Sequence, residues 1–227
     1  MTISRLAMKS GWLALAGVLF CGCLPAQAQQ FSAEIMIMKD NGAAAPAGKV
    51  YVAGGKERIE TPDHTDGFFV IDRAAPSAYF VQPLSRQFMD ARQSSRLTQI
   101  FVTVDPDNPC LQWEAMTKLA GVADQGAWHC ERVGQETIDG SSAIAYRALS
   151  ASGRELLGWV DPMRKFPLRV KTEDGAVFQV GNLHDQPQAA ELFEVPTNFR
   201  KFDPRALIDR IKQSDVRVEN HERHGGP

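Results

Sequence analysis

Apolar and polar residues alternate with a period of two through much of residues 131–202. In one run, Ile144, Tyr146 and Ala148 alternate with Ala145, Arg147 and Leu149. This period is typical of a pleated sheet with one face better buried than the other. Turn residues separate the runs at 139–140, 152–153, 161–162 and 174–175, and Asp-Gly is a strong signal for a short hairpin. We therefore predict four or five antiparallel strands in series.

A second series of short strands is expected before residue 90. The apolar runs lie at 31–39, 49–61, 68–72 and 78–81. Gly54 and Gly55 interrupt the second run and predict a hairpin turn, while Pro62 stops the strand that follows the turn. The chain is thus predicted to be α+β, mainly β, with two antiparallel meanders.

Between the meanders the apolar period changes to that of a helix at 109–120. Asn108 is placed as its cap, Pro109 at its first position and Gly121 at its end. The apolar stripe comprises Leu111, Ala115, Met116, Leu119 and Ala120. Trp113 falls on the flank of this stripe. We expect the stripe to pack against the sheet.

Two further helices are predicted from weaker signals. One covers residues 94–101, and a last one opens at Asp203 with Leu207, Ile208 and Ile211 as its apolar positions. The pattern ends after residue 215, and residues 216–227 are predicted to be a disordered tail.

The first 28 residues have the pattern of a secretory signal peptide. Arg5 and Lys9 precede a short apolar run, and Ala26-Gln27-Ala28 forms a small-x-small cleavage site. The run is too short to span a bilayer. We expect a periplasmic or secreted protein after cleavage near Ala28. In the alternative, a lipoprotein acylated at Cys23, the preceding Phe20-Cys21-Gly22 would lack the usual aliphatic lipobox residue.

Length and charge narrow the class of protein. A chain of 227 residues with 44% hydrophobic residues suits one domain, placed at 29–215. Of 25 basic and 27 acidic residues, the signal removes two basic ones, which leaves a net charge of −4. Mild acidity without a basic stripe argues against nucleic acid as a partner.

Cys110 and Cys130 remain after the signal is removed. An even number of cysteines in an exported chain predicts a disulfide, and a loop of this size would stabilise the fold by about 3 kcal/mol in the chain-entropy model. His129 is adjacent but would point to the other face of a strand, so we expect no metal site here.

Several strand-turn phrases resemble the periplasmic LolA/LolB-like superfamily of lipoprotein carriers, and most closely its DUF4412-type exported members. These phrases lie at 134–140, 145–147, 158–161, 166–170 and 192–196, within a likeness that covers 31–203. The resemblance implies a strongly curved antiparallel sheet, an unclosed half-barrel, with helices packed in its concave face. It also implies a carrier of acyl chains without catalytic residues. The cysteine pair and the C-terminal helix depart from the carriers.

We therefore expect a non-enzymatic protein that binds a lipid, a lipoprotein acyl chain or another hydrophobic ligand between the sheet and a helical lid. The residues predicted to line that cavity are Leu111, Met116, Leu119, Tyr146, Trp159 and Phe178. In the alternative these residues fill a dry core, and the chain is an envelope interaction or scaffold module. No nucleophile elbow is present. We expect no cofactor, no membrane span and a monomer.

Overall fold

The computed structural model describes residues 30–39, 42–91, 95–121, 126–206, 208, 209 and 212. The predicted signal peptide at 1–28, with Cys21 and Cys23, lies outside the described residues, and so does the predicted tail at 216–227.

The N-terminal meander consists of six strands, each hydrogen-bonded to the next along the chain. They are β1 (Gln30–Met38), β2 (Ala44–Ala53), β3 (Lys56–Glu60), β4 (Phe68–Asp72), β5 (Ser77–Gln82) and β6 (Gln87–Asp90). The predicted hairpin between β2 and β3 is confirmed. Gly54 and Gly55 have positive φ angles of 59° and 79°, which this tight turn requires and glycine adopts readily. Sequence periodicity did not predict β6.

The C-terminal meander consists of five strands, β7 (His129–Ile138), β8 (Ser141–Leu149), β9 (Glu155–Asp161), β10 (Phe166–Lys171) and β11 (Val177–Asp185). The Asp139-Gly140 turn joins β7 and β8, and both residues have positive φ. In β8, Tyr146 and Ala148 are buried, whereas Arg147 is exposed.

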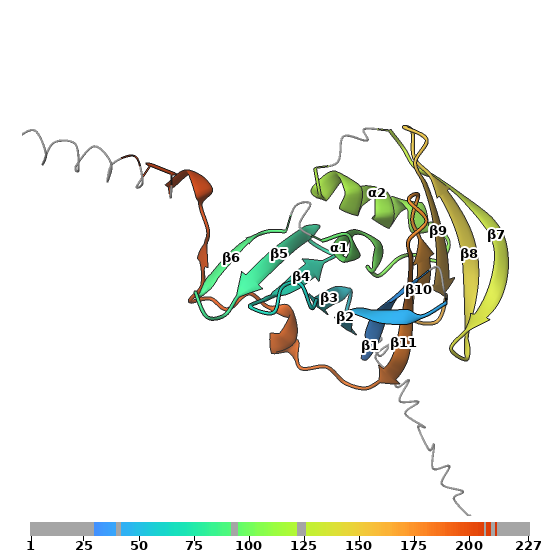
Figure 1. Cartoon of the computed structure of the whole chain (residues 1–227), viewed down its shortest axis with the longest axis horizontal. Helices are drawn as coiled ribbons and strands as arrows, with labels where there is room; N and C mark the ends of the chain where they lie inside the picture. Colours follow the sequence, from blue (N-terminus) through green and yellow to red (C-terminus); the bar gives the residue numbers. More distant parts are fainter. Residues whose placement is uncertain are drawn as a thin grey trace, which may run out of the picture.

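The two meanders form one continuous sheet because β1 pairs with β11 as well as with β2. The order of the strands in the described chain is β12-β6-β5-β4-β3-β2-β1-β11-β10-β9-β8-β7, in which the short β12 (Arg200–Lys201) is parallel to β6 and every other pair is antiparallel. The sheet is strongly curved and does not close, because β7 and β12 lie at opposite edges (Figure 1). The predicted fold class is confirmed.

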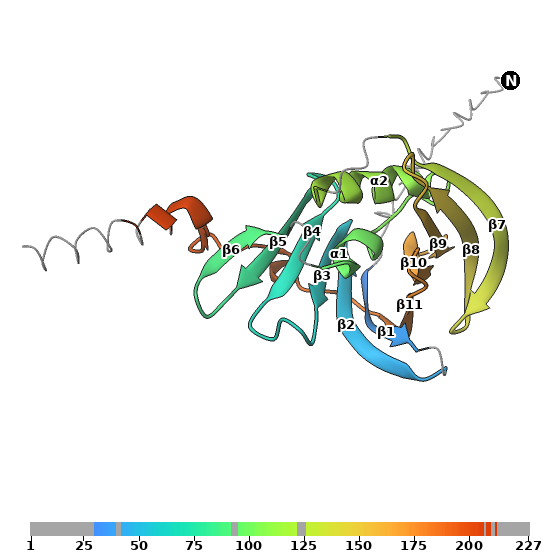
Figure 2. The ribbon, with the colours of Figure 1, turned by 45° about the horizontal axis from the view of Figure 1, so that its top comes forward.

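Two helices, α1 (Leu97–Ile100) and α2 (Pro109–Leu119), lie over the concave face of the sheet (Figure 2). A Cβ atom added at Gly48 of β2 would lie 3.3 Å from Leu97 of α1. A Cβ atom added at Gly158 of β9 would lie 2.4 Å from the ring of Trp113 of α2. Each helix therefore packs closely on a strand where glycine leaves room.

The predicted limits of α2 are confirmed, but its buried face is only partly the predicted one: Met116 and Ala120 are buried as expected, and Leu111 is not. Helix α2 begins at Pro109, and Gly121 beyond its end has a φ of 76°. Leu111 is 63% exposed, whereas Trp113 is 1% exposed and lies at the centre of the buried face. Apolar residues recur at helical spacing both on the stripe that contains Leu111 and on the stripe that contains Trp113. The close fit of Trp113 against Gly158 selects the stripe that faces the sheet.

The remaining short elements follow β11. A 3-10 helix, η1 (Ala190–Phe193), buries Phe193. The carboxylate of Asp203 accepts hydrogen bonds from the backbone N–H groups of Arg205 and Ala206, so the predicted cap of the last helix is confirmed. Ile208 is 50% exposed, while Leu207 and Ile211 lie outside the described residues.

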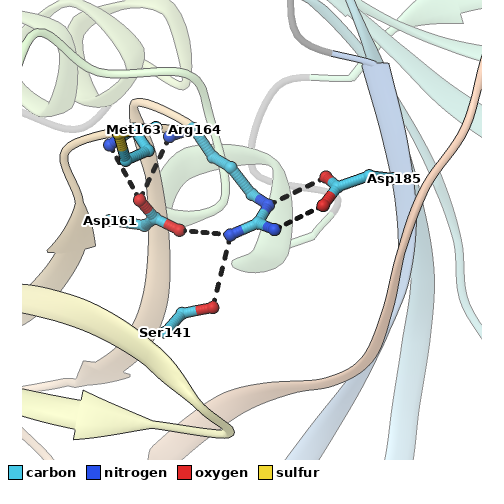
Figure 3. A network of polar contacts seen from close by, with 5 residues as sticks. All are labelled: Ser141, Asp161, Met163, Arg164 and Asp185. Atoms are coloured by element: carbon cyan, nitrogen blue, oxygen red, sulfur yellow. Dashed lines mark hydrogen bonds and ion pairs between the residues drawn. The ribbon is translucent and has the colours of Figure 1, made fainter.

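A polar cluster ties together three strands of the C-terminal meander (Figure 3). Arg164, in the turn between β9 and β10, donates to Asp185 of β11 at 2.5 and 3.0 Å. It also donates to the buried Asp161 of β9 at 2.6 Å and to Ser141 of β8 at 3.3 Å. The guanidinium holds the pKa of Asp185 below its usual value. The cluster fixes the turn of one hairpin to its neighbours.

Candidate functional site

A cleft opens beside the helices, at the tips of two hairpins. It has a volume of about 490 Å³, within the range of small-molecule sites. Its lining comes from α1, α2, the residues before β7, the start of β9 and the turn between β10 and β11. The lining residues are Arg96, Gln99, Ile100, Trp113, Thr117, Trp128, Arg154, Glu155, Leu156, Thr172, Glu173 and Asp174.

The apolar part of the cleft is formed by both helices and β9. The indole N–H of Trp113 donates to the backbone carbonyl of Ile100 at 3.3 Å and so connects α2 to α1. The hydroxyl of Thr117 donates to the backbone carbonyl of Trp113 at 2.9 Å. Leu156, 7% exposed, completes this part of the lining. These contacts fix the inner wall before any ligand enters.

A charged rim surrounds this apolar part. Arg96, just before α1, forms an ion pair with Asp174 at 2.7 Å and also donates to the Thr172 hydroxyl at 3.4 Å. A hydrogen bond from Thr172, together with the one from Arg96, lowers the pKa of Asp174 to about 2. Asp174 is therefore ionised at neutral pH, and the pair links the helical lid to the β10–β11 turn.

Trp128 forms the outer wall of the cleft. Its backbone N–H donates to the carboxylate of Glu114 on α2 at 3.1 Å, and the guanidinium of Arg154 lies 5.8 Å from the centre of its ring. The indole Nε1 is buried and has no hydrogen-bond partner among the described residues.

The predicted disulfide between Cys110 and Cys130 is confirmed, with a Cα–Cα distance of 5.6 Å. It joins the first turn of α2 to the second residue of β7. Trp113 follows Cys110 closely in sequence, and Trp128 closely precedes Cys130. The bond therefore holds the two indole-bearing walls of the cleft in place.

The connector between α1 and α2 is fixed to the sheet by a buried carboxylate. Glu57 of β3 is fully buried, and its Oε1 accepts from the backbone N–H of Thr103 at 2.6 Å and from the Thr103 hydroxyl. Its Oε2 is buried without a partner among the described residues. Burial raises the pKa of Glu57 from 4.5 to about 7, although the hydrogen bonds from Thr103 oppose this shift.

None of the six predicted cavity residues lines the 490 Å³ cleft. The predicted position of Leu111 on the buried face is wrong, since it points to solvent. Met116, 2% exposed, and Leu119 line a smaller cavity of about 110 Å³ between the helices and β5–β6. Gln99 lines both cavities and lies between them.

The three predicted strand residues divide between the two faces of the sheet. Tyr146, Gly158, Val170 and Phe178 lie in one row of paired residues, which faces Trp113. Burial raises the pKa of Tyr146, whose hydroxyl donates to the Pro106 carbonyl at 2.5 Å. Trp159, next to Gly158, lies on the opposite face under the guanidinium of Arg169, so its predicted position between helix and sheet is wrong. Contact of the six residues with a ligand stays a prediction.

Sequence reasoning missed the residues that build the cleft. Trp128 follows the helix in an irregular segment, and Arg96 and Asp174 are 78 positions apart. The one available signal was the position of Trp128 close to Cys130 in sequence. A disulfide brings the residues beside one cysteine against the element that carries the other.

The lining of the cleft is made of apolar, hydroxyl, amide, carboxylate and guanidinium side chains. The described residues that line the cleft include no Ser, Cys or His, so the cleft has none of the usual nucleophile–imidazole pairs. In the described part of the chain, no three His, Cys, Asp or Glu side chains are grouped to hold a metal ion. The described helices are all too short or too polar to cross a membrane.

No protein-family model and no curated protein matches the chain. The predicted likeness to DUF4412-type proteins therefore stays a prediction.

Solved structures with a similar fold have low sequence identity to the chain. PNGF-II is 9% identical with a TM-score of 0.48, over 82% of this chain and 34% of that one. MucB is 15% identical with a TM-score of 0.44, over 76% and 59%. A putative outer membrane lipoprotein-sorting protein domain from Vibrio parahaemolyticus is 12% identical with a TM-score of 0.35, over 75% and 91%. These similarities concern the fold alone.

Proposed function

We propose that this chain is a non-enzymatic periplasmic protein that binds a lipid, an acyl chain or another hydrophobic ligand. The observation that carries the proposal is the 490 Å³ cleft, whose inner wall includes the apolar side chains of Ile100, Trp113 and Leu156. Its rim is charged, so an amphipathic molecule would place its apolar part inside and its polar part at the rim. The periplasmic location rests on the predicted signal peptide.

A fluorescent fatty acid, 11-(dansylamino)undecanoic acid, tests this proposal. We expect saturable binding with a rise in dansyl fluorescence. Gln99→Trp, which fills the cleft from α1, should weaken binding at least tenfold. Leu111→Trp is the matched control, because it adds the same indole to an exposed position of α2 and should leave the affinity unchanged.

Lipid mass spectrometry of the purified protein gives an independent test. The proposal predicts a co-purifying amphiphile that Gln99→Trp loses. If no lipid co-purifies and no fluorescent fatty acid binds, the proposal is wrong.

A second candidate function is supported by the close packing of α2 on β9. The ring of Trp113 occupies the space above Gly158, so α2 packs closely on β9 at this point. An interaction module with a dry core would use its surface or the tail at 216–227 instead. Deleting that tail should then abolish partner pull-down from an envelope extract at an unchanged melting temperature, and an unchanged pull-down would exclude a role for the tail.

A further inference from the structure

The outer wall of the cleft is attached to α2 at two points. One is the Cys110–Cys130 disulfide, and the other is the hydrogen bond from the Trp128 backbone N–H to the carboxylate of Glu114. Trp128 lies two residues before Cys130, and Trp113 lies three residues after Cys110. The bond therefore fixes the spacing of the two indole rings that the cleft requires.

The disulfide lies at the rim of the molecule. Cys110 is 3% exposed on α2, but Cys130 is only half-buried, at the start of β7. Strand β7 forms the edge of the sheet and is exposed along most of its length (Figure 2). Cys130 is therefore the more accessible of the two cysteines to a reductant, and accessible disulfides exchange more readily than buried ones.

We propose that the Cys110–Cys130 disulfide controls ligand binding in the cleft: the oxidised bond holds the Trp128 wall against α2, and reduction by a dithiol releases that wall. This inference rests on the proposed function of the cleft. A thiolate of the dithiol attacks Cys130 Sγ and displaces Cys110 as a thiolate. Its second thiolate then resolves the mixed disulfide, so that two cysteine thiols form and the dithiol is oxidised by two electrons.

The consequence for binding follows from the chain between the cysteines, which are 20 residues apart in sequence. Once the bond is open, the Trp128 wall is held by the hydrogen bond to Glu114 and by the pairing of β7 with β8, in which His129 faces Leu149. Without the covalent link the distance between Trp128 and α2 is less tightly fixed, and fixing it again is a cost that the ligand must overcome. The reduced chain should bind the ligand more weakly.

Titration of the oxidised and the dithiothreitol-reduced protein with 11-(dansylamino)undecanoic acid tests the inference. We expect at least tenfold weaker binding after reduction. A Cys110→Ser/Cys130→Ser variant should bind equally weakly, and adding the dithiol should not change its affinity. A methylene bridge introduced between the two sulfurs with diiodomethane is the matched control, because it keeps the tie but cannot be reduced. This form should bind like the oxidised protein with or without dithiol.

Labelling with 5-fluorotryptophan reports on the wall directly. Reduction should shift the 19F resonance of Trp128 and leave that of Trp159 on the opposite face unchanged. Equal affinities of the two forms, or an unmoved Trp128 resonance, would overturn the inference. Loss of the far-UV circular dichroism on reduction would also overturn it, since the bond would then be structural only.

Failure of the proposed function gives a different result. Neither form would then bind the fluorescent fatty acid, while the Trp128 resonance would still move on reduction. That outcome would support the link between bond and wall and exclude this ligand class.

Discussion

At the scale of single residues, Glu57 stands out because it is an ionisable side chain in a fully buried position. It is a carboxylic acid with no exposed surface, held by one threonine. Because its pKa is about 7 when folded and 4.5 is its usual value, the folded chain retains a proton between these pH values that the unfolded chain has lost. The stability that Glu57 contributes is therefore full below pH 4.5 and is lost as the pH rises to 7.

Glu57→Gln should remove this pH dependence, because an amide does not titrate. We expect the variant to match the parent near pH 4.5 and to exceed its free energy of unfolding by about 3 kcal/mol at pH 8, at roughly 1.4 kcal/mol for each pKa unit. Urea unfolding at a series of pH values measures this difference. An equally steep pH dependence in both proteins would show that Glu57 is not its source.

A second residue-scale prediction concerns Gly158. Gly158→Ala places a methyl group against the Trp113 ring, which packing prevents from moving. We expect a loss of about 1–3 kcal/mol in the free energy of unfolding, typical of overpacking. Gly181→Ala is the control, because the added Cβ would meet nothing within 4 Å in the same sheet. If both substitutions prove neutral, the fit between α2 and β9 is looser than described.

At the scale of elements, polar ties decide how the hairpins are held. Arg164 serves three strands at once, and Asp161 beneath it is 2% exposed. One oxygen of Asp161 also accepts from the backbone N–H groups of Met163 and Arg164, which shapes the turn.

Arg164→Met should leave the second Asp161 oxygen buried without its cation. The expected loss is about 1–3 kcal/mol in the free energy of unfolding, the usual cost of an unsatisfied buried polar group. Lys201→Met is the control, since the Lys201–Asp90 pair is solvent-exposed and such pairs contribute about 0–1 kcal/mol. Thermal unfolding of both variants measures the difference. Equal losses would show that Arg164 does not hold the β9–β10 turn to the neighbouring strands.

At the scale of the whole molecule, the two meanders meet at one strand pair. Ile35 of β1 is fully buried and pairs with Val180 of β11 and with Gly48 of β2. The sheet therefore depends on β1 for its continuity, and the two halves should unfold together.

Ile35→Ala should lower the free energy of unfolding by about 2–5 kcal/mol through the cavity that it leaves. The loss should affect both halves equally. Tryptophan fluorescence follows the C-terminal half and hydrogen exchange of β4 follows the N-terminal half, so coincident transitions are expected. Ile208→Ala, at a position 50% exposed, should change stability by less than about 0.5 kcal/mol. Separate transitions in the parent would show that the halves are independent.

The sequence by itself determined the elements of this protein and much of their order. Period two in residues 144–149, the Gly54-Gly55 and Asp139-Gly140 turns and the Pro109 and Gly121 limits of α2 all act over a few neighbouring residues. Backbone preferences of this kind are local, so a single chain reveals them. The cysteine pair was also predictable, because two cysteines allow one pairing.

Only the tertiary structure decided which faces are inside and where the cleft lies. The apolar pattern placed Leu111 on the buried stripe of α2 and Trp113 on its flank, whereas the structure buries Trp113 and exposes Leu111. Leu156 and Trp159 are both apolar residues of one strand, so the pattern there did not decide which face is inside. The choice came from shape, because Gly158 leaves room for one indole ring above the sheet. The cleft joins side chains from five separate segments, whose meeting depends on how the curved sheet turns beneath the helices.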